Sequence, residues 1–198
     1  MPCLVMKFGG TSVANLDRIR QAAERIKLEV AQGNQIIVIV SAMSGKTNDL
    51  VKWVNEASTL YDTQEYDAVV SSGENITAGV MALTLQEMDI SAQSWQGWQV
   101  PVKTTNMHGN ARIEEIPTKN LEDSFANGTQ VAVVAGFQGV SASGRITTLG
   151  RGGSDTTAVA FAAAFKAKRC DIFTDVDGIY TTDPRISSDA RKLDKIAF

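Results

Sequence analysis

Short runs of apolar residues alternate with amphipathic stretches along this chain. The runs 4–8 and 35–40 are continuous, as in strands that are buried on both faces. Between them, Asn15 can cap a helix that Gly33 ends, and the apolar positions recur every three or four residues. These positions are Leu16, Ile19, Ala23, Ile26 and Val30. The pattern therefore predicts a strand, a helix and a second strand.

The rest of the chain continues this alternation. We expect helices over residues 48–60, 74–88 and 118–126 and from Ser154 onward, and strands within 91–103 and over 131–135 and 169–174. Residues 141–148 have the polar, Gly-centred pattern of a hairpin. In the stretch 74–88 the expected buried face holds Ile76, Val80, Leu83 and Met88. Strands and helices at this spacing predict an α/β fold with a largely parallel sheet.

Composition and charge narrow the class of protein. The 198 residues are 43% hydrophobic and 21% charged, which are ordinary values for a globular domain. The net charge of -3 lacks the basic excess of nucleic-acid-binding proteins, so we expect no nucleic acid partner. No apolar run approaches the roughly 20 residues of a membrane span and no secretory signal is recognised, so we expect a cytoplasmic protein without a membrane partner. Cys3 and Cys170 are expected to be reduced and buried.

The loops that follow the strands are the places to search for chemistry, because ligands of parallel sheets bind beyond the carboxyl ends of the strands. After the first strand, Gly9 and Gly10 let backbone N–H groups approach an anion, and Lys7 adds a positive charge. This loop is a candidate phosphate cradle. A Gly-Gly turn beside a solvated lysine is the alternative.

The loop after the second strand ends in Gly45-Lys46-Thr47, as a P-loop does. A P-loop also needs a glycine five residues before Gly45, where Val40 stands inside a strand, so the motif is absent. Ser41 and Thr47 are interpreted as hydroxyl donors to a small polar ligand or as ordinary helix caps.

The loop over residues 147–157 is the richest in polar groups. It holds three glycines, Arg151, several hydroxyls and Asp155 directly before an apolar helix. An arginine there can bind a carboxylate through two parallel hydrogen bonds, and a helix N-terminus favours negative charge beside it. Asp155 stands where a dinucleotide fingerprint needs glycine, which excludes that motif; an ordinary first-turn carboxylate is its other interpretation.

Two further motifs are discounted. Residues 175–178 begin like a calcium loop but lack the third acid before Gly178. His108 is the single histidine of the chain and is interpreted as a loop residue, because a catalytic triad or a zinc site needs more partners than the sequence contains.

Together, these loops resemble the amino acid kinase family, and within it the aspartate kinases (aspartokinases). Residues 7–13 match the signature Lys, aromatic, Gly, Gly, Ser or Thr, Ser, aliphatic. Five more blocks follow in the family's order, at residues 72–74, 108–113, 136–139, 147–157 and 174–180. The resemblance covers essentially the whole chain. It implies the three-layer αβα amino acid kinase fold, which is also that of carbamate kinase.

The resemblance also implies a reaction, the transfer of the γ-phosphoryl group of ATP to the β-carboxylate of L-aspartate. The product is 4-phospho-L-aspartate, at the first step of lysine, threonine and methionine biosynthesis. The attacking carboxylate is already ionised at neutral pH, so no general base is required. Mg2+ would bridge the phosphates, mostly through water and nucleotide oxygens.

Roles for individual residues are implied in the same way. Lys7 and Asp155 would be the catalytic residues, with Lys7 neutralising charge on the transferred group. Arg151 would bind the α-carboxylate of aspartate, and Glu74 would contact its ammonium group or organise the site. The ATP-binding residues would be Lys7, Phe8, Gly9, Gly10, Thr174, Asp175, Tyr180 and Arg185. The aspartate-binding residues would be Ser41, Thr47, Glu74, Arg151, Gly152 and Ser154.

The family's catalytic domain continues beyond position 198 with a further nucleotide-binding loop and closing helices, and two small regulatory ACT domains follow. By resemblance, residues 1–198 are the amino-terminal part of the catalytic domain, incomplete at the C-terminus and without ACT domains. The nucleotide pocket is then expected to be open on one side, with weak or no activity. A homo-oligomer is expected for the full-length enzyme.

Other interpretations stay open. A kinase for glutamate, acetylglutamate or a nucleoside monophosphate would share the Gly-rich lysine loop, although the blocks 8–12 and 151–155 favour aspartate. A module that binds nucleotide or amino acid without turnover is the alternative from another class. A globular α/β domain whose Gly-rich loops bind nothing is the third.

Overall fold

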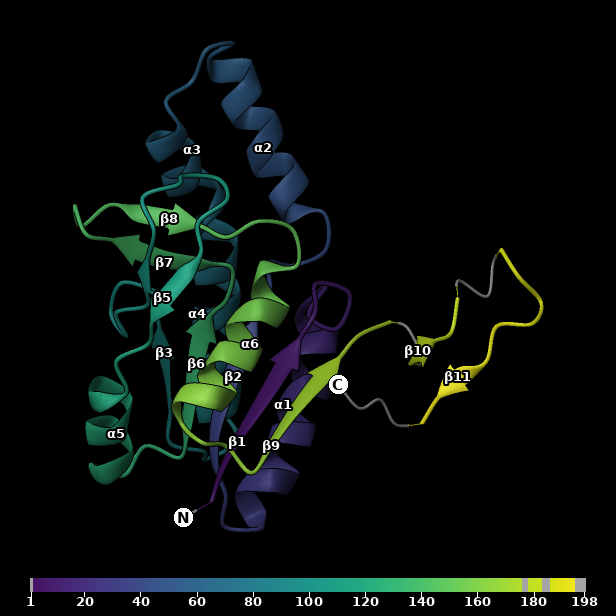
Figure 1. Ribbon diagram of the computed structural model, residues 1–198. Coiled ribbons are helices and arrows are strands. Elements are labelled where there is room, and N and C mark those ends of the chain that lie inside the picture. Colours follow the sequence, from purple (N-terminus) through teal and green to yellow (C-terminus); the bar gives the residue numbers. More distant parts are fainter. Residues whose placement is uncertain (1, 176–177, 183–185, 195–198) are drawn as a thin grey trace.

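A five-stranded parallel sheet forms the centre of the molecule, in the order β3-β6-β2-β1-β9 (Figure 1). The computed structural model describes residues 2–175, 178–182 and 186–194. The strands of this sheet are β1 (Cys3–Phe8), β2 (Gln35–Val40), β3 (Ala92–Trp95), β6 (Val131–Ala135) and β9 (Arg169–Phe173). Strands β1, β2 and β6 are buried on both faces, as their continuous apolar runs predict.

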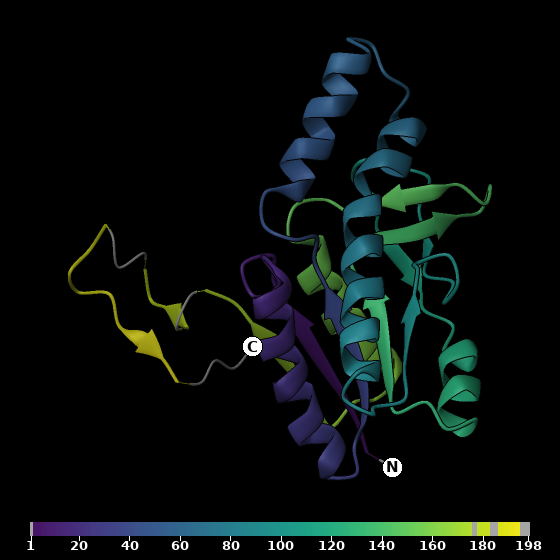
Figure 2. The ribbon, with the colours of Figure 1, turned by 180° about the vertical axis from the view of Figure 1, so that it is seen from behind.

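Helices cover both faces of the sheet, which confirms the predicted three-layer α/β fold. On one face lie α1 (Leu16–Ala31) and α4 (Ser72–Gln86), which stand in front in Figure 2. On the other lie α5 (Lys119–Ala126) and α6 (Gly153–Ala164). Alternate residues of the strands pack into two separate cores, because successive side chains of a strand point to opposite faces of the sheet. Met6 packs with α1 and α4, whereas Val5 packs with α5 and α6.

A second, smaller sheet lies beyond the carboxyl ends of the central strands (Figure 1). Its order is β5-β4-β7-β8, formed by β4 (Lys103–Thr104), β5 (Ile113–Glu115), β7 (Gln138–Ser141) and β8 (Ile146–Thr148). Strands β7 and β8 form the predicted hairpin. Helices α2 (Lys46–Ala57) and α3 (Thr63–Val70) lie beside it. Strands β10 (Ile179–Tyr180) and β11 (Lys192–Leu193) pair in an antiparallel ribbon that stands apart from the body in both views.

The helix starts and stops largely follow the sequence pattern. The Asn15 side chain accepts a hydrogen bond from the Arg18 N–H, which confirms the predicted cap of α1. Gly33 follows the end of α1 with a φ of 80°, a conformation that favours glycine. Leu16 differs from the prediction, because it lies in the first turn and is exposed.

The predicted register of α4 is partly wrong, although Val80 and Met88 are half-buried and pack against the core as expected. Ile76 and Leu83 were expected in the core and are 60% and 66% exposed, whereas Met81 and Leu85 are fully buried. The buried face of α4 consists of Gly73, Glu74, Thr77, Ala78, Met81, Ala82 and Leu85. These mostly small residues let the helix lie close against β3 and β6, and the face was misread because it mixes polar and apolar positions.

Two other expectations need correction. Helix α3 was not predicted, since its eight residues follow a polar loop and show little periodicity. Cys3 and Cys170 are free thiols, as expected, but they are half-buried rather than buried. Burial nevertheless raises the pKa of the Cys3 thiol to about 11, which disfavours the reactive thiolate. In the described part of the chain, no helix is both long and apolar enough to cross a membrane.

Candidate active site

A cavity of about 300 Å³ lies beyond the carboxyl ends of β1 and β2, where the loops selected from the sequence meet. The loop after β2 forms one wall, and the first turns of α4 and α6 form the others. The structure brings together eight of the predicted site residues in its lining: Lys7, Gly10, Ser41, Thr47, Glu74, Gly152, Ser154 and Asp155. The polar residues that the sequence pattern singled out therefore converge.

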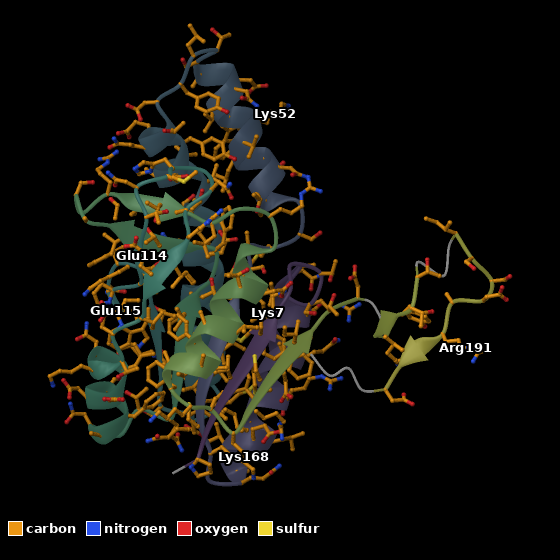
Figure 3. All side chains as sticks on the ribbon, viewed as in Figure 1. Lys7, Lys52, Glu114, Glu115, Lys168 and Arg191 are labelled. Carbon is orange, nitrogen blue, oxygen red and sulfur yellow. The ribbon has the colours of Figure 1, made fainter. Side chains whose placement is uncertain are left out.

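Lys7 is a buried cation at the end of β1. Its side chain is 8% exposed, and its Nζ lies 2.7 Å from Oδ1 of Asp155 in the first turn of α6. Figure 3 shows Lys7 in the middle of the molecule, whereas Lys52 and Lys168 lie at its periphery. An ammonium group has three N–H donors, so the contact to Asp155 leaves donors for an anion in the cavity. The alternative of a solvated lysine is excluded by this burial.

The two glycines after β1 allow close packing around this lysine. A Cβ at Gly9 would lie 3.2 Å from the Lys7 Nζ, and one at Gly10 would lie 3.0 Å from the Ala42 carbonyl oxygen. The Gly9 N–H donates to the Phe173 carbonyl, at 3.1 Å. Gly9 thus joins β1 to β9 through its backbone, and Gly10 is the glycine of this pair that lines the cavity.

Glu74 is a buried carboxylate with one oxygen left over. It lies in the first turn of α4 and is 3% exposed. Its Oε1 accepts a hydrogen bond from the Ala42 N–H at 3.0 Å, whereas its buried Oε2 has no hydrogen-bond partner among the described residues. Burial raises the pKa of Glu74 from 4.5 to about 7, although the Ala42 bond acts the other way. A ligand that brought a positive charge to Oε2 would remove this penalty.

Uncapped helix starts add partial positive charge to the same cavity. Helices α2 and α6 begin after Gly45 and Gly152, which have φ values of 83° and 78° and no side-chain cap. Ser41 and Thr47 are therefore not the caps that the alternative interpretation required. Their hydroxyls, with that of the buried Ser154, stand beside helix N-termini that favour a negatively charged ligand.

Arg151 lies outside this cavity in the structure. It is exposed and lines a neighbouring cavity of about 780 Å³, which also contacts Asn110 and Arg112. The two cavities share Gly153 and Asp155. Arg151 thus stands at the border of the candidate site rather than in its wall.

The predicted ATP-binding residues are more scattered. The Phe8 side chain is buried on the α1 side, where it stacks on Phe173 with ring centroids 4.7 Å apart. Thr174 lines a cavity of about 230 Å³ on that side, and its hydroxyl donates to Asp175 at 3.2 Å. Tyr180 lies in the β10–β11 ribbon. Arg185 lies outside the described residues.

Sequence reasoning missed two residues near the site. Phe137 lines the cavity with a φ of 67°, which is rare for an aromatic residue, and its N–H donates to the Thr157 hydroxyl. His108 is more than a loop residue, because its Nδ1 lies 2.7 Å from Oδ2 of the fully buried Asp67. The position of each inside a block of the family pattern was the available signal.

Among the described residues, no group of three His, Cys, Asp or Glu side chains could hold a metal ion.

Comparisons with known proteins agree with this geometry. The pattern of the amino acid kinase family matches residues 2–198. An aspartokinase of Rickettsia felis is 55% identical over 201 residues, which cover 100% of this chain and 50% of that protein. The chain thus spans about half the length of the curated relatives it matches.

Solved structures show the same similarity. The aspartate kinase of Synechocystis has a TM-score of 0.79 and 46% identity, over 95% of this chain and 31% of that chain. Escherichia coli aspartokinase III, in a complex with aspartate and ADP, has a TM-score of 0.84 and 30% identity, over 97% of this chain and 53% of that chain.

Proposed function

The chain belongs to the amino acid kinase family, and from this premise we propose that its residues bind L-aspartate and support its phosphorylation by ATP. In this reaction a β-carboxylate oxygen of aspartate forms a bond to the γ-phosphorus of ATP, and the bond from that phosphorus to the ADP oxygen breaks. The products are 4-phospho-L-aspartate and ADP. The observation that carries the proposal is the buried Glu74 Oε2, unpartnered among the described residues, in one cavity with the buried Lys7.

The cavity provides complementary groups for each part of aspartate. Glu74 would accept hydrogen bonds from the ammonium group and be held ionised by it. The hydroxyls of Ser41, Thr47 and Ser154, together with the uncapped starts of α2 and α6, would bind carboxylate oxygens. Arg151, at the border, would reach the α-carboxylate from the neighbouring cavity. A volume of about 300 Å³ suits a small amino acid.

Lys7 would stabilise the charge that develops on the transferred phosphoryl group. Such transfers depend on positioning and electrostatics, and a cation already held in place loses little entropy in the transition state. The 2.7 Å contact with Asp155 would keep the Lys7 ammonium directed toward the cavity. Because the β-carboxylate is ionised at neutral pH, no side chain needs to remove a proton from it.

Magnesium would enter with ATP as part of the substrate. The half-exposed carboxylate of Asp155 adjoins Lys7, which suits an ion held mainly by phosphate oxygens and water. Bound Mg2+ would neutralise phosphate charge. Thr174, Asp175, Tyr180 and Arg185 remain proposed contacts for the nucleotide, supported by their match to the family pattern. The homo-oligomer of the full-length enzyme and the cytoplasmic location are likewise proposals, which rest on the resemblance to the aspartate kinases.

Trapping of an acyl phosphate by hydroxylamine tests the proposal. The chain is incubated with Mg-ATP, hydroxylamine and, in separate samples, aspartate, glutamate or acetylglutamate, and the hydroxamate is measured. We expect aspartyl hydroxamate at a low rate, since the nucleotide pocket is expected to be open on one side, together with an equal amount of ADP, and little product from the other two acids. Preference for glutamate or acetylglutamate would refute the assignment of substrate. Binding of aspartate without any hydroxamate would make the chain a binding module instead.

A further inference from the structure

Asp67 is a fully buried carboxylate that takes no part in the cavity. It lies on α3, and its side chain is 0% exposed. Its Oδ2 accepts from the His108 Nδ1 at 2.7 Å, and its Oδ1 accepts from the Gly109 N–H at 3.0 Å and from the Thr148 hydroxyl. A buried carboxylate is costly unless donors surround it, so this cluster is stable only when all three donors are in place.

The three donors come from two segments distant in the chain. His108 and Gly109 belong to the loop between β4 and β5, and Thr148 ends β8. The same segments are joined directly, because the Ala111 N–H donates to the Thr148 carbonyl at 2.9 Å and Ala111 forms a parallel bridge with Leu149. Asp67 therefore fixes the loop and the end of β8 relative to each other and to α3.

The end of β8 leads straight into the candidate site. Leu149 follows Thr148, and its N–H donates to the carbonyl of Phe137, a residue of the cavity wall. Gly150 lies against the same β4–β5 loop, since a Cβ there would come 2.3 Å from the Asn110 Oδ1. Arg151 and Gly152 come next, and α6 begins at Gly153. The buried cluster thus fixes the start of the segment 149–153, and the end of this segment lies in the cavity.

We propose that Asp67 and His108 are positioning residues for the amino acid substrate, an inference that rests on the proposed function. They hold Thr148, and through it the segment 149–153, in the place from which Arg151 and Ser154 meet the carboxylates of the substrate. His108 supplies the closer of two donors to the Asp67 Oδ2, at 2.7 Å, whereas the Gly109 N–H lies 3.1 Å from the same oxygen. The effect concerns aspartate rather than ATP, because Asp67 binds Thr148 at the end of β8, which leads into the segment 149–153, whereas Lys7 and Gly10 belong to β1 and the loop after it.

A pair of His108 variants tests this role. His108→Leu removes the donor to Asp67, and His108→Asn keeps an N–H donor near the position of Nδ1. We expect His108→Leu to raise the KM for aspartate about tenfold while the KM for ATP changes less than about twofold, and His108→Asn to restore most of the difference. A purely structural role would raise both KM values together or lower only the melting temperature, and either result would overturn the proposal.

Hydrogen–deuterium exchange gives a second measurement that needs no activity. The amides of residues 149–153 should exchange faster in His108→Leu, at a normal rate in His108→Asn, and those of β1 should not change in either. Thr148→Val, which replaces the hydroxyl by a methyl group, should give the same local effect if His108→Leu does not fold. Unchanged exchange in this segment would overturn the positioning role. Absence of aspartate turnover in the wild type would instead overturn the proposed function, while the exchange data still decide this inference.

Discussion

Lys7 and Glu74 are buried groups of opposite charge in one cavity, and their surroundings leave each with capacity for a ligand. Lys7 has Asp155 as a partner but keeps further donors, and Glu74 has one satisfied and one unsatisfied oxygen. An amino acid and a phosphate together carry the complementary charges. The importance of Lys7 could be predicted from its place before Gly9, whereas the burial of Glu74 depends on the α4 register, which the sequence pattern did not reveal.

Replacement of Lys7 tests its role in phosphoryl transfer. Lys7→Ala should lower turnover about a hundredfold or more, because it removes the cation that faces the developing charge. Asp155 is half-exposed, so the loss of its partner should cost little stability. Steady-state rates of ADP release measure the effect, with Lys52→Ala, an exposed lysine on α2, as the matched control. Equal turnover in Lys7→Ala and the control would remove Lys7 from the site.

The raised pKa of Glu74 predicts that aspartate binding depends on pH. If the ionised form binds the ammonium group, the affinity should rise as the pH increases through about 7, by nearly tenfold per pH unit below that value. Titration calorimetry at pH 6, 7 and 8 measures it. Glu74→Gln should bind weakly at every pH. A flat profile in the wild type would show that Glu74 does not contact the ammonium group.

The raised pKa of Glu74 also predicts that the free energy of unfolding depends on pH. The folded-state pKa of Glu74 is raised above its ordinary value of 4.5, so the folded chain holds this proton more tightly than the unfolded chain. The free energy of unfolding should therefore fall by about 3 kcal/mol as the pH rises from about 4.5 to about 7. Urea unfolding across this range should show the slope in the wild type and a smaller slope in Glu74→Gln. The same pH dependence of stability in the wild type and in Glu74→Gln would contradict the raised pKa of Glu74.

A substitution of Arg151 tests whether this residue binds aspartate from the border between the two cavities. Arg151→Lys keeps the charge but loses the planar pair of donors that grips a carboxylate, so it should raise the KM for aspartate far more than that for ATP. Steady-state kinetics with each substrate varied in turn measures both values. Equal changes in the two would instead favour a structural role for this exposed side chain.

At the scale of the elements, the contact between α4 and the loop after β2 holds Glu74 against Ala42. A Cβ at Gly73 would lie 2.8 Å from the Ala42 Cβ, so only glycine allows this approach without a shift. The sequence placed Gly73 directly before the helix expected over 74–88 but could not indicate the contact with Ala42, because the two residues lie 31 positions apart in the chain (73 − 42).

Two alanine substitutions in α4 test this contact. Gly73→Ala should destabilise the fold by about 1–3 kcal/mol and weaken aspartate binding, since it pushes Ala42 away from Glu74. Gly79→Ala, at a position of the same helix with open space around it, should stabilise the fold by about 0.5–1 kcal/mol and leave binding unchanged. Thermal unfolding and calorimetry measure both effects. Equal stability and equal aspartate affinity in the two variants would show that the close approach at Gly73 does not affect aspartate binding.

At the scale of the whole molecule, continuous apolar strands and the alternation of helices were enough to predict the parallel sheet. What periodicity could not predict depends on tertiary contacts: helix α3, the face that α4 buries, and the buried Asp67 that turns His108 from a loop residue into a partner. In each case polar or small residues lie inside, where a search for apolar stripes does not look. The meeting of Lys7 and Ser41 in one cavity could be predicted from the sequence, because they lie at the ends of β1 and β2, which pair in parallel.

The most direct test of the mechanism follows an oxygen atom. Aspartate labelled with ¹⁸O in its β-carboxylate is incubated with the chain, Mg-ATP and hydroxylamine, and the released phosphate is analysed by mass spectrometry. Hydroxylamine attacks the carbonyl carbon, so phosphate that came through 4-phosphoaspartate keeps the bridging oxygen. We predict one ¹⁸O atom in this phosphate, and about a hundredfold less labelled phosphate in the same time when Lys7→Ala replaces the wild type. Unlabelled phosphate from the wild type would mean that water, and not the substrate carboxylate, attacks ATP, and would contradict the proposed reaction.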